Sequence, residues 1–465
     1  MTTFRVCCVV FLIMSNLVSA AQTSVNWDAP EARNPILPGY FADPSVVAHE
    51  GKFYLYATLD PWGGETLGCW ESVDFANWTY RSLNWPTKAA CTSATSKGAM
   101  VWAPSVVRGA GGRFYMYVSV GSEVWAGVAD HPLGPWENPL GDRPLIPGNF
   151  RPGYHMIDAE AFVDDDGTAY LYWGSGWNWT NGRCFAVKLS EDMISFDGEP
   201  RDVTPPHYFE APFMLKRGGR YFLMYSDGKT VEDTYEVRCA VGDSPLGPFT
   251  EVETSPLLTT EHARQVVSPG HHTMFLHEDR TYIVYHRHRI PYVKDMAYRQ
   301  ICMDELVFDG TGMPQKVLPT HTGPTLLSAR EDTRRSAIRV VRATASSEAS
   351  GGLNTAAAVL NDNYATRWVP ESDAQNVWLQ LDLGEEQAVR RSEIRFEYAW
   401  KRYDFVVQLS LDGNSWRPAG ETHATSEIVG SPCIVPHEGR ARYVRIQFSD
   451  ATPASDIGIF SWRIY

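Results

Sequence analysis

One sequence phrase occurs five times along this chain and constrains its fold more than any other feature. In the fullest copy, residues 154–174, an acid enters an apolar run that is followed by a glycine turn and an aromatic-rich run. The other copies begin with FADPSVV at Phe41, WAPSVV at Trp102, FEAPFML at Phe209 and PGHHTMF at Pro269. Repeats of short strands joined by glycine turns are typical of propeller blades, because one such unit cannot bury its faces alone. The sequence therefore predicts a five-bladed β-propeller.

Alignment of the copies on their aromatic runs places five residues in one register: Asp43, Ala103, Asp158, Glu210 and His271. The first strand of a propeller blade lines the central channel, so residues that share a register converge on one small volume. Three of the five are carboxylic acids. Like charges held close together must separate their pKa values, which is the arrangement that acid–base catalysis uses. We expect a catalytic site on the axis.

The surroundings of the three acids suggest their roles. Glu210 lies in YFEAPF, between aromatic residues and a proline, so it is the candidate proton donor with a raised pKa. Asp43 is then the ionised base, and Asp158 tunes the pKa of the donor and orients it. Acids that only cap strands or hold a structural cation are the alternative. Three buried acids in one register would be a costly way to cap strands, which favours catalysis.

The first twenty residues have the pattern of a secretory signal peptide. Arg5 precedes an apolar run at residues 6–14, and Val18-Ser19-Ala20 is a small-residue cleavage pattern. The run is shorter than the ~20 residues that span a membrane, so a signal is favoured over an anchor. We expect a secreted or periplasmic protein, cleaved near Ala20, with no membrane insertion.

The rest of the chain divides into two all-β domains. Strands and glycine or proline turns fill residues 22–315, which form the predicted propeller. Residues 316–337 have the composition of a linker or an irregular strap. Alternating strands return over residues 338–465, with a hairpin turn at Asp412-Gly413, and predict a β-sandwich.

Charge and cysteine content limit the other possibilities. A net charge of −14 argues against a nucleic-acid partner, which requires a basic surface. Six of the eight cysteines lie outside the signal region, and no CxxC occurs, so neither a zinc site nor a disulfide scaffold is indicated. Cys69 with Cys91 is the best candidate for a single disulfide. The sequence leaves the oligomeric state open.

The phrases around Asp43, Asp158 and Glu210, together with Gly270-His271-His272, resemble glycoside hydrolase family 43 over about residues 33–310. The resemblance implies a five-bladed propeller and inverting hydrolysis, without a cofactor for the chemistry. It makes Asp43 the general base, Asp158 the pKa modulator and Glu210 the general acid. Inversion requires acid and base about 6.5–9.5 Å apart, with a water molecule between them.

Further site residues are expected, of which the role of His271 is implied by the resemblance and the others by the chemistry of their side chains. His271 would reach a calcium ion or a water cluster in the channel. Arg287 would hydrogen-bond substrate hydroxyls, or else close the propeller through an ion pair. The candidates for stacking against a sugar ring are Trp102, Trp177, Trp62 and Trp125.

The C-terminal segment resembles the discoidin-like, coagulation factor V/VIII type C domains, which include carbohydrate-binding module family 32. The resemblance rests on the phrases YATRW, WLQLDLG, LSLDG and RYVR. It implies a jelly-roll sandwich that binds sugar through its loops, with Trp400 or Tyr403 as candidates. A purely structural role against the propeller is the alternative.

These observations predict an exported exo-glycosidase that acts on oligo- or polysaccharides. It would remove terminal α-L-arabinofuranosyl or β-D-xylosyl residues, and β-D-galactofuranosyl residues are also open. A non-catalytic sugar-binding propeller with an accessory carbohydrate-binding domain is the alternative. Binding alone does not require a protonated glutamic acid opposite an ionised aspartate, so the three acids favour an enzyme.

Overall fold

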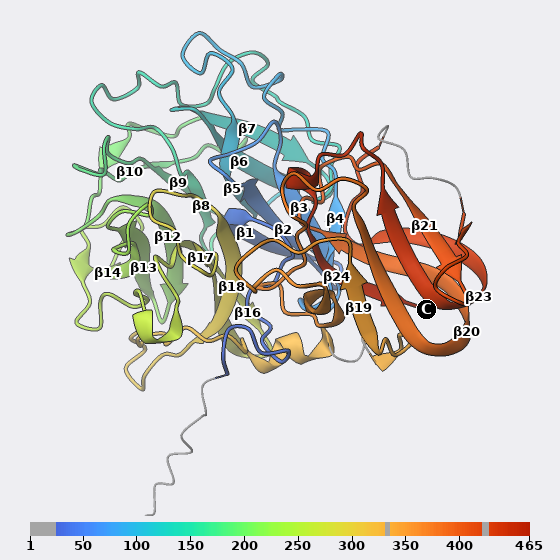
Figure 1. Ribbon diagram of the computed structural model, residues 1–465. Coiled ribbons are helices and arrows are strands. Elements are labelled where there is room, and N and C mark those ends of the chain that lie inside the picture. The colour runs from blue at the N-terminus through green and yellow to red at the C-terminus, as the bar shows by residue number, and fades with distance from the viewer. Residues whose placement is uncertain (1–24, 331–334, 421–426) are drawn as a thin grey trace, which may run out of the picture.

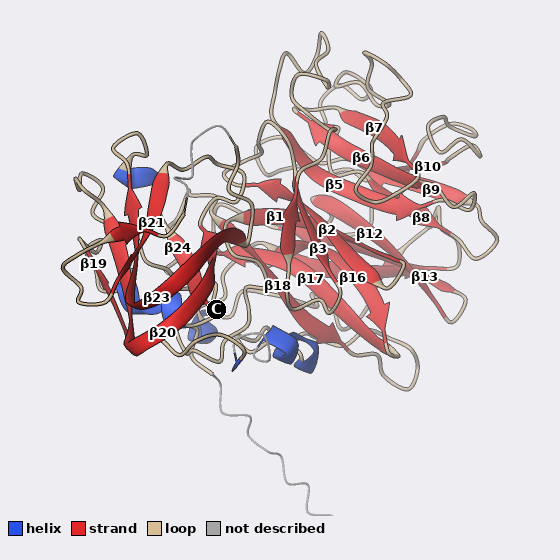
Figure 2. Ribbon diagram, turned by 90° about the vertical axis from the view of Figure 1, so that its right-hand side faces the viewer, coloured by secondary structure: helices blue, strands red, loops and turns tan. Residues whose placement is uncertain are grey.

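The structure, a computed structural model, describes residues 25–330, 335–420 and 427–465, and it is built mostly from β-strands (Figures 1 and 2). The predicted signal peptide lies outside the described residues. No helix in the described ranges is long and apolar enough to cross a membrane.

Between residues 41 and 306, the described chain forms five antiparallel sheets, each with its strands in chain order. The first sheet comprises β1 (Phe41–His49), β2 (Lys52–Leu59), β3 (Gly68–Ser72) and β4 (Thr79–Arg81), and the second comprises β5 (Val101–Arg108), β6 (Phe114–Val120) and β7 (Val124–Ala129). The third comprises β8 (Glu160–Val163), β9 (Ala169–Trp173), β10 (Phe185–Lys188) and β11 (Arg201–Asp202). The fourth comprises β12 (Glu210–Arg217), β13 (Arg220–Asp227), β14 (Glu236–Gly242) and β15 (Thr250–Glu251), and the fifth comprises β16 (Gly270–His277), β17 (Arg280–His288) and β18 (Arg299–Leu306). The first strands contact one another in the order β1, β5, β8, β12, β16, and β16 contacts β1.

One residue at or just before the first strand of each sheet adopts a left-handed backbone conformation. These residues are Asp43, Ala103, Asp158, Ala211 and His271, with φ between 39° and 56°. β1, β5, β12 and β16 each have a register shift at this point, and such bulges re-aim side chains. The register predicted from sequence is therefore one residue off in the fourth sheet, where Ala211 occupies the bulge and Glu210 precedes it.

Side chains from the second strands link neighbouring sheets at these bulges. In four of the five described sheets, a side chain on the second strand accepts the bulge N–H of the next sheet. The bonds run from Ala103 N to Thr58 Oγ1 at 2.7 Å, from Asp158 N to Ser119 Oγ at 3.0 Å, from His271 N to Ser226 Oγ at 2.9 Å and from Asp43 N to His286 Nδ1 at 3.3 Å. Gly174, whose N–H donates to the Ile157 carbonyl at 2.8 Å, holds the corresponding position in the third sheet and has no side chain.

Apolar side chains fill the spaces between neighbouring sheets. Cys69 and Cys91 lie in the cluster between the first and second sheets, together with Trp85, Val101 and Trp125. Cys69 and Cys91 are both buried and neither forms a disulfide bond, so the predicted disulfide between them is wrong. Both thiols serve as small apolar groups in this core.

The C-terminal region forms a separate antiparallel sheet. Its strands are β19 (Arg342–Ala345), β20 (Trp378–Phe396), β21 (Phe405–Ser410), β22 (Arg417–Pro418), β23 (Cys433–Phe448) and β24 (Ile459–Ile464). They run in the order β19-β20-β23-β21-β22, and β24 pairs with β20. Trp368, Phe396 and Ile446 belong to a core that is separate from the cores of the five sheets.

The C-terminal region packs directly against the first and fifth sheets (Figure 1). The Trp400 ring contacts Phe41 of β1 edge-on at 5.3 Å, and Tyr403 is 1% exposed and stacks on Phe396. The buried Tyr403 ring cannot hold a sugar, so the prediction for Tyr403 is wrong. Trp400 is half-buried, and sugar binding by Trp400 stays a prediction.

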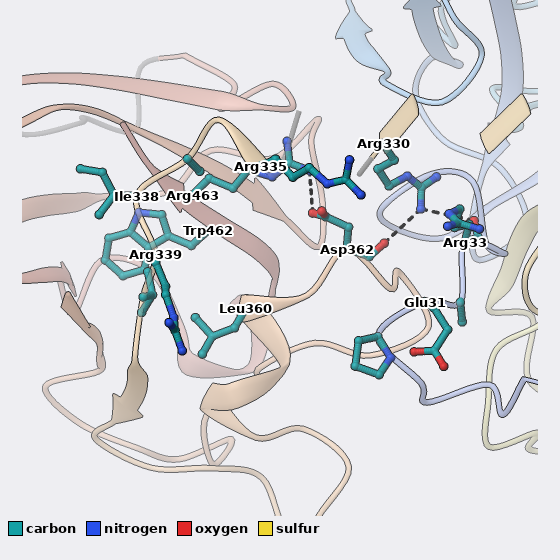
Figure 3. A pocket seen from close by; sticks show the side chains of 14 residues that line it. Glu31, Arg33, Arg330, Arg335, Ile338, Arg339, Leu360, Asp362, Trp462 and Arg463 are labelled. Carbon is teal, nitrogen blue, oxygen red and sulfur yellow. Dashed lines mark hydrogen bonds and ion pairs between the residues drawn. The ribbon is translucent and has the colours of Figure 1, made fainter. Parts of the chain in front are cut away.

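The segment predicted as a linker also packs against this junction. Leu327 is fully buried, and the Arg330 guanidinium donates to the carbonyls of Ile36 and Asp362, both at 3.0 Å. Figure 3 shows Arg330 between Arg33 and Asp362, beside a cavity of 600 Å³ at the junction. The described part of this segment therefore ties the start of the chain to the C-terminal region.

Candidate active site

A cavity of 240 Å³ lies where the first strands of the five sheets converge, and residues from all five sheets line it. Four of the five residues that the sequence placed in one register lie here. Ala103 does not line the cavity. The lining residues used below are Asp43, Asp158, Glu210, His271, Trp62, Trp102, His155, Trp177, Trp179, Phe209, Thr230 and Arg299.

Asp43 is buried and surrounded by hydrogen-bond donors and positive charge. Arg299 Nη1 donates to Asp43 Oδ1 at 3.0 Å, and the Thr58 hydroxyl donates to Oδ2 at 2.7 Å. The Nδ1 atoms of His271 and His286 each lie 3.2 Å from Oδ1. Burial alone would raise the pKa of Asp43, but Arg299 and then the two histidines outweigh it and hold the pKa well below its usual value. Asp43 is therefore ionised.

Arg299 is fixed by a second carboxylate, Asp60. Nε and Nη2 of Arg299 donate to the two oxygens of Asp60 at 2.9 and 2.7 Å, and the Arg299 backbone N–H donates to Asp60 at 2.7 Å. Such fork-to-fork pairing fixes the plane of a guanidinium group. Arg299 therefore presents its remaining nitrogen to Asp43 in one orientation.

Glu210 lies in a different environment. The Tyr235 hydroxyl donates to Oε1 at 2.7 Å, and the Ser175 hydroxyl donates to Oε2 at 3.0 Å. Burial raises the pKa of Glu210 to about 7, and these two hydrogen bonds oppose the rise. Two carboxyl groups in one cavity therefore have well-separated pKa values, with Asp43 ionised and Glu210 able to keep a proton near neutral pH.

Asp158 lines the same cavity as Asp43 and Glu210. Burial, then the charges of Glu210 and Asp43, raise the pKa of Asp158 well above its usual value. Its Oδ2 lies 3.6 Å from His271 Nδ1, and its Oδ1 has no hydrogen-bond partner among the described residues. The charge of Glu210 disfavours the ionised form of Asp158, so a proton on one stabilises charge on the other.

His271 could contribute a single imidazole nitrogen to a metal ion. Burial lowers the pKa of His271, and its Nδ1 faces Asp43 at 3.2 Å. The described residues contain no cluster of three or more His, Cys, Asp or Glu side chains that could hold a metal ion. The protein groups here do not fit a full calcium site, which would need several oxygen ligands.

Aromatic side chains form the walls of the cavity. Trp177 is 46% exposed and stacks on His155 at 4.1 Å, and Trp62 is 41% exposed and lies 5.1 Å from the Arg299 guanidinium. Trp102 lines the cavity and donates to the Gly121 carbonyl at 3.3 Å. Flat apolar faces beside polar groups match the two kinds of surface on a sugar ring.

Two predicted substrate-binding residues lie elsewhere. Trp125 is fully buried in the core between the first and second sheets, where its indole donates to Glu123 at 3.0 Å. Arg287 is 1% exposed and donates to Cys302 Sγ at 3.2 Å and to the His288 carbonyl at 3.0 Å. Neither lines the cavity, so both substrate-binding predictions are wrong. Arg287 forms no recorded ion pair within the described residues, so its alternative role is not seen either.

Several site residues were missed by the sequence reasoning: Asp60, His155, Ser175, Trp179, Phe209, Thr230, Tyr235, His286 and Arg299. Most lie outside the repeated phrase. The exceptions are His155, Phe209 and His286, which lie inside copies of the phrase, and Ser175 directly follows the aromatic run that ends at Gly174. His286 carried the best available signal, since it lies in the aromatic run of the fifth copy.

Comparisons with known proteins agree with this architecture. Residues 32–314 match the glycosyl hydrolases family 43, and residues 342–461 match the F5/8 type C domain. The β-D-galactofuranosidase of Aspergillus niger is 35% identical over 309 residues, which cover 63% of this chain and 85% of that protein. The arabinoxylan arabinofuranohydrolase of Bacillus subtilis is 27% identical over 349 residues, which cover 63% of this chain and 66% of that protein.

A solved structure described as a glycoside hydrolase matches with a TM-score of 0.76 at 27% identity, over 94% of this chain and 99% of its own. Both family resemblances inferred from the sequence are thereby confirmed. The chain belongs to family 43 of the glycosyl hydrolases and is a glycoside hydrolase.

Proposed function

We propose that this glycoside hydrolase removes terminal furanosyl or pentosyl residues from oligo- or polysaccharides, with inversion at the anomeric carbon. Asp43 is the general base, Glu210 the general acid, and Asp158 the group that tunes Glu210. One observation carries the proposal: an ionised Asp43 and a Glu210 with a raised pKa line the same small cavity. A sugar-binding protein without catalysis does not require that pair.

The proposed step balances as a single displacement. Asp43 takes a proton from a water molecule as the water oxygen bonds to the anomeric carbon. The glycosidic C–O bond breaks, and the proton of Glu210 passes to the departing oxygen. Proton exchange with solvent then restores Asp43 and Glu210. Arg299 keeps Asp43 ionised before the substrate binds, and burial keeps Glu210 protonated.

The size of the cavity supports removal of single terminal residues. Its 240 Å³ is below the ~300–1,000 Å³ of pockets for drug-sized ligands, so it suits one sugar ring rather than an extended chain. Among sugars, we favour β-D-galactofuranosyl and α-L-arabinofuranosyl residues, because the two relatives compared above are named for these activities. Terminal β-D-xylosyl residues remain a candidate from the sequence resemblance.

We also propose that the five sheets are the blades of a closed five-bladed propeller over residues 22–315, followed by a strap at 316–337 and a sandwich at 338–465. The cyclic contacts of β1, β5, β8, β12 and β16 support closure. Export to the periplasm or the medium is proposed from residues 1–20 alone. A calcium ion near His271 stays a prediction, and no step above uses it.

A panel of glycosides tests the function. Wild-type protein and Glu210→Gln are assayed on p-nitrophenyl β-D-galactofuranoside, α-L-arabinofuranoside and β-D-xyloside, and on disaccharides of the same sugars. Glu210→Gln is expected to lose about 10²–10⁴-fold on the disaccharides, whose leaving groups need a proton, and much less on the activated aryl glycosides. NMR of the first-formed sugar should show inversion. Equal losses on both substrate types would reject Glu210 as the acid, and retention would reject the mechanism.

A further inference from the structure

We propose that the C-terminal region is a positioning element for the catalytic base: it holds the two chain segments that carry Asp43 and Arg299 at a fixed separation. The inference rests on the proposed function of Asp43 as the base. It assigns to the F5/8 type C region a role in the hydrolytic site itself, beyond binding polysaccharide.

The segment that carries Asp43 is held just before the acid. Phe41 is fully buried, and its ring lies edge-on between Trp70 of β3 and Trp400 of the C-terminal region, both at 5.3 Å. Trp400 therefore packs on a side chain only two residues from Asp43.

The preceding residue, Tyr40, also packs against the C-terminal region. The Arg367 guanidinium lies 5.5 Å from the Tyr40 ring, and the ring of Tyr398 lies at 6.4 Å. Arg367 is itself fixed by a buried ion pair with Glu397 at 3.0 Å. Two successive side chains on the approach to Asp43 thus have partners in the C-terminal region.

The segment that carries Arg299 is held on both sides. Gln300 is buried, and its Nε2 donates to the carbonyl of Tyr364, in the C-terminal region, at 2.8 Å. On the other side of Arg299, the ring of Tyr298 lies edge-on to Tyr40 at 5.0 Å. The C-terminal region therefore contacts the Arg299 segment directly at Gln300 and, through Tyr40, indirectly at Tyr298.

We call these contacts, made by Trp400, Arg367, Tyr398 and Tyr364 of the C-terminal region, the clamp. They lie at the junction between the first and fifth sheets. Arg299 begins β18 of the fifth sheet and Asp43 lies on β1 of the first, so their 3.0 Å bond spans the junction between the first and last sheets. The other four junctions join sheets that follow each other in the chain, whereas this junction has no direct chain connection. The N-terminal segment adds a bond from Ile36 N to the Ile301 carbonyl at 2.8 Å. Arg330, in the segment at residues 316–337, donates to the carbonyls of Ile36 and Asp362 and so links the N-terminal segment to the C-terminal region.

A change in the Arg299–Asp43 separation has a measurable effect on catalysis. A catalytic group that is misplaced by about one ångström can cost about 10²-fold in rate. Asp43 is the proposed base, so we expect kcat to fall by up to about 10²-fold while KM changes little. A purely structural domain would change thermal stability without lowering the kcat of the folded enzyme.

The test uses two variants in the clamp and one control in the full-length protein. Trp400→Ala removes the ring on Phe41, and Gln300→Met removes the bond to the Tyr364 carbonyl at nearly constant volume. Ile446→Ala, in the separate core of the C-terminal region, is the control for loss of stability alone. At a temperature where all variants are folded, kcat should fall in Trp400→Ala and Gln300→Met with little change in KM and should match the wild type in the control, while Tm falls in Trp400→Ala and Ile446→Ala.

Crystal structures of both variants measure the Arg299–Asp43 separation without turnover. If the wild-type protein hydrolyses none of the glycosides, the proposed function fails, and the crystal structures still decide whether the C-terminal region sets the distance from Arg299 Nη1 to Asp43 Oδ1. An unchanged distance in folded Gln300→Met and Trp400→Ala would overturn the inference.

Discussion

Removal of the Tyr235 hydroxyl should extend activity to higher pH. Tyr235 is buried, and its hydroxyl donates to Glu210 Oε1 at 2.7 Å, while its ring stacks parallel to His286 at 5.7 Å. Tyr235→Phe keeps the ring and its packing and deletes only the donor. The hydroxyl stabilises the ionised form of Glu210, so its loss should raise the pKa of Glu210 further.

The size of this shift follows from the strength of the bond. A hydrogen bond to a charged group contributes ~1.5–3 kcal/mol, and the same donor to a neutral carboxylic acid contributes about half as much. The difference between the two protonation states is then ~0.8–1.5 kcal/mol, or about one pKa unit. Burial raises the pKa of Glu210 to about 7, so the pKa of Glu210 in the variant should be about 8.

The sign and the assay follow from the role of Glu210. A general acid works when it is protonated, so kcat/KM falls as pH rises through its pKa in the free enzyme. The basic limb should therefore move upward by about one pH unit in Tyr235→Phe, measured on a disaccharide with a poor leaving group. Tyr225→Phe is the matched control, because that hydroxyl donates to the Pro206 carbonyl at 2.6 Å and touches no carboxylate. A basic limb that stays in place, or moves downward, would refute the assignment of Glu210.

Three further changes test other parts of the site. Asp43→Asn should reduce kcat/KM by about 10²–10⁴-fold on aryl glycosides and disaccharides alike, because the attacking water needs a base whichever group leaves; a loss confined to disaccharides would contradict this. Thr230→Val should raise KM about 3- to 10-fold with little change in kcat, because Thr230 lines the cavity and its buried hydroxyl has no described protein partner; a fall in kcat alone would exclude a binding role. Asp60→Asn should reduce kcat/KM, because Arg299 loses the partner that orients it toward Asp43; an unchanged kcat/KM would show that Arg299 needs no such support.

The parts of the fold and site that could be predicted are those that repeat along the chain. Five copies of one phrase predicted the five antiparallel sheets and brought Asp43, Asp158 and His271 to the same bulge position. The flanking aromatic residues and proline correctly indicated that Glu210 lies in a setting that raises its pKa. Local pattern sufficed for these residues, because each copy repeats the same strand–turn–strand unit.

The partners that complete the site come from distant parts of the chain. Arg299 follows Asp43 by 256 residues and Asp60 by 239, and neither Arg299 nor Asp60 belongs to the repeated phrase. Only the closure of the first sheet on the fifth brings these side chains together. The sequence also did not distinguish the tryptophans that line the cavity from those in the core. Trp177 follows the end of a strand and lies at the cavity, whereas Trp125 lies within β7, whose residues are all buried.

The fourth copy, where the predicted register is one residue off, also differs from the others in the group that accepts the N–H of its bulge residue. In the other four sheets, Thr58, Ser119, Ser226 or His286 accepts the N–H of the next bulge residue. Gly174 holds that position in the third sheet with φ of +116°, and a Cβ there would lie 2.4 Å from the Arg183 carbonyl oxygen, so a serine or threonine cannot fit. The N–H of the next bulge residue, Ala211, instead interacts with the Asp158 carboxyl group and lowers its pKa. The missing side chain thus makes Asp158 the link between the third and fourth sheets, directly beside Glu210, which is where a group that tunes the proton donor must lie.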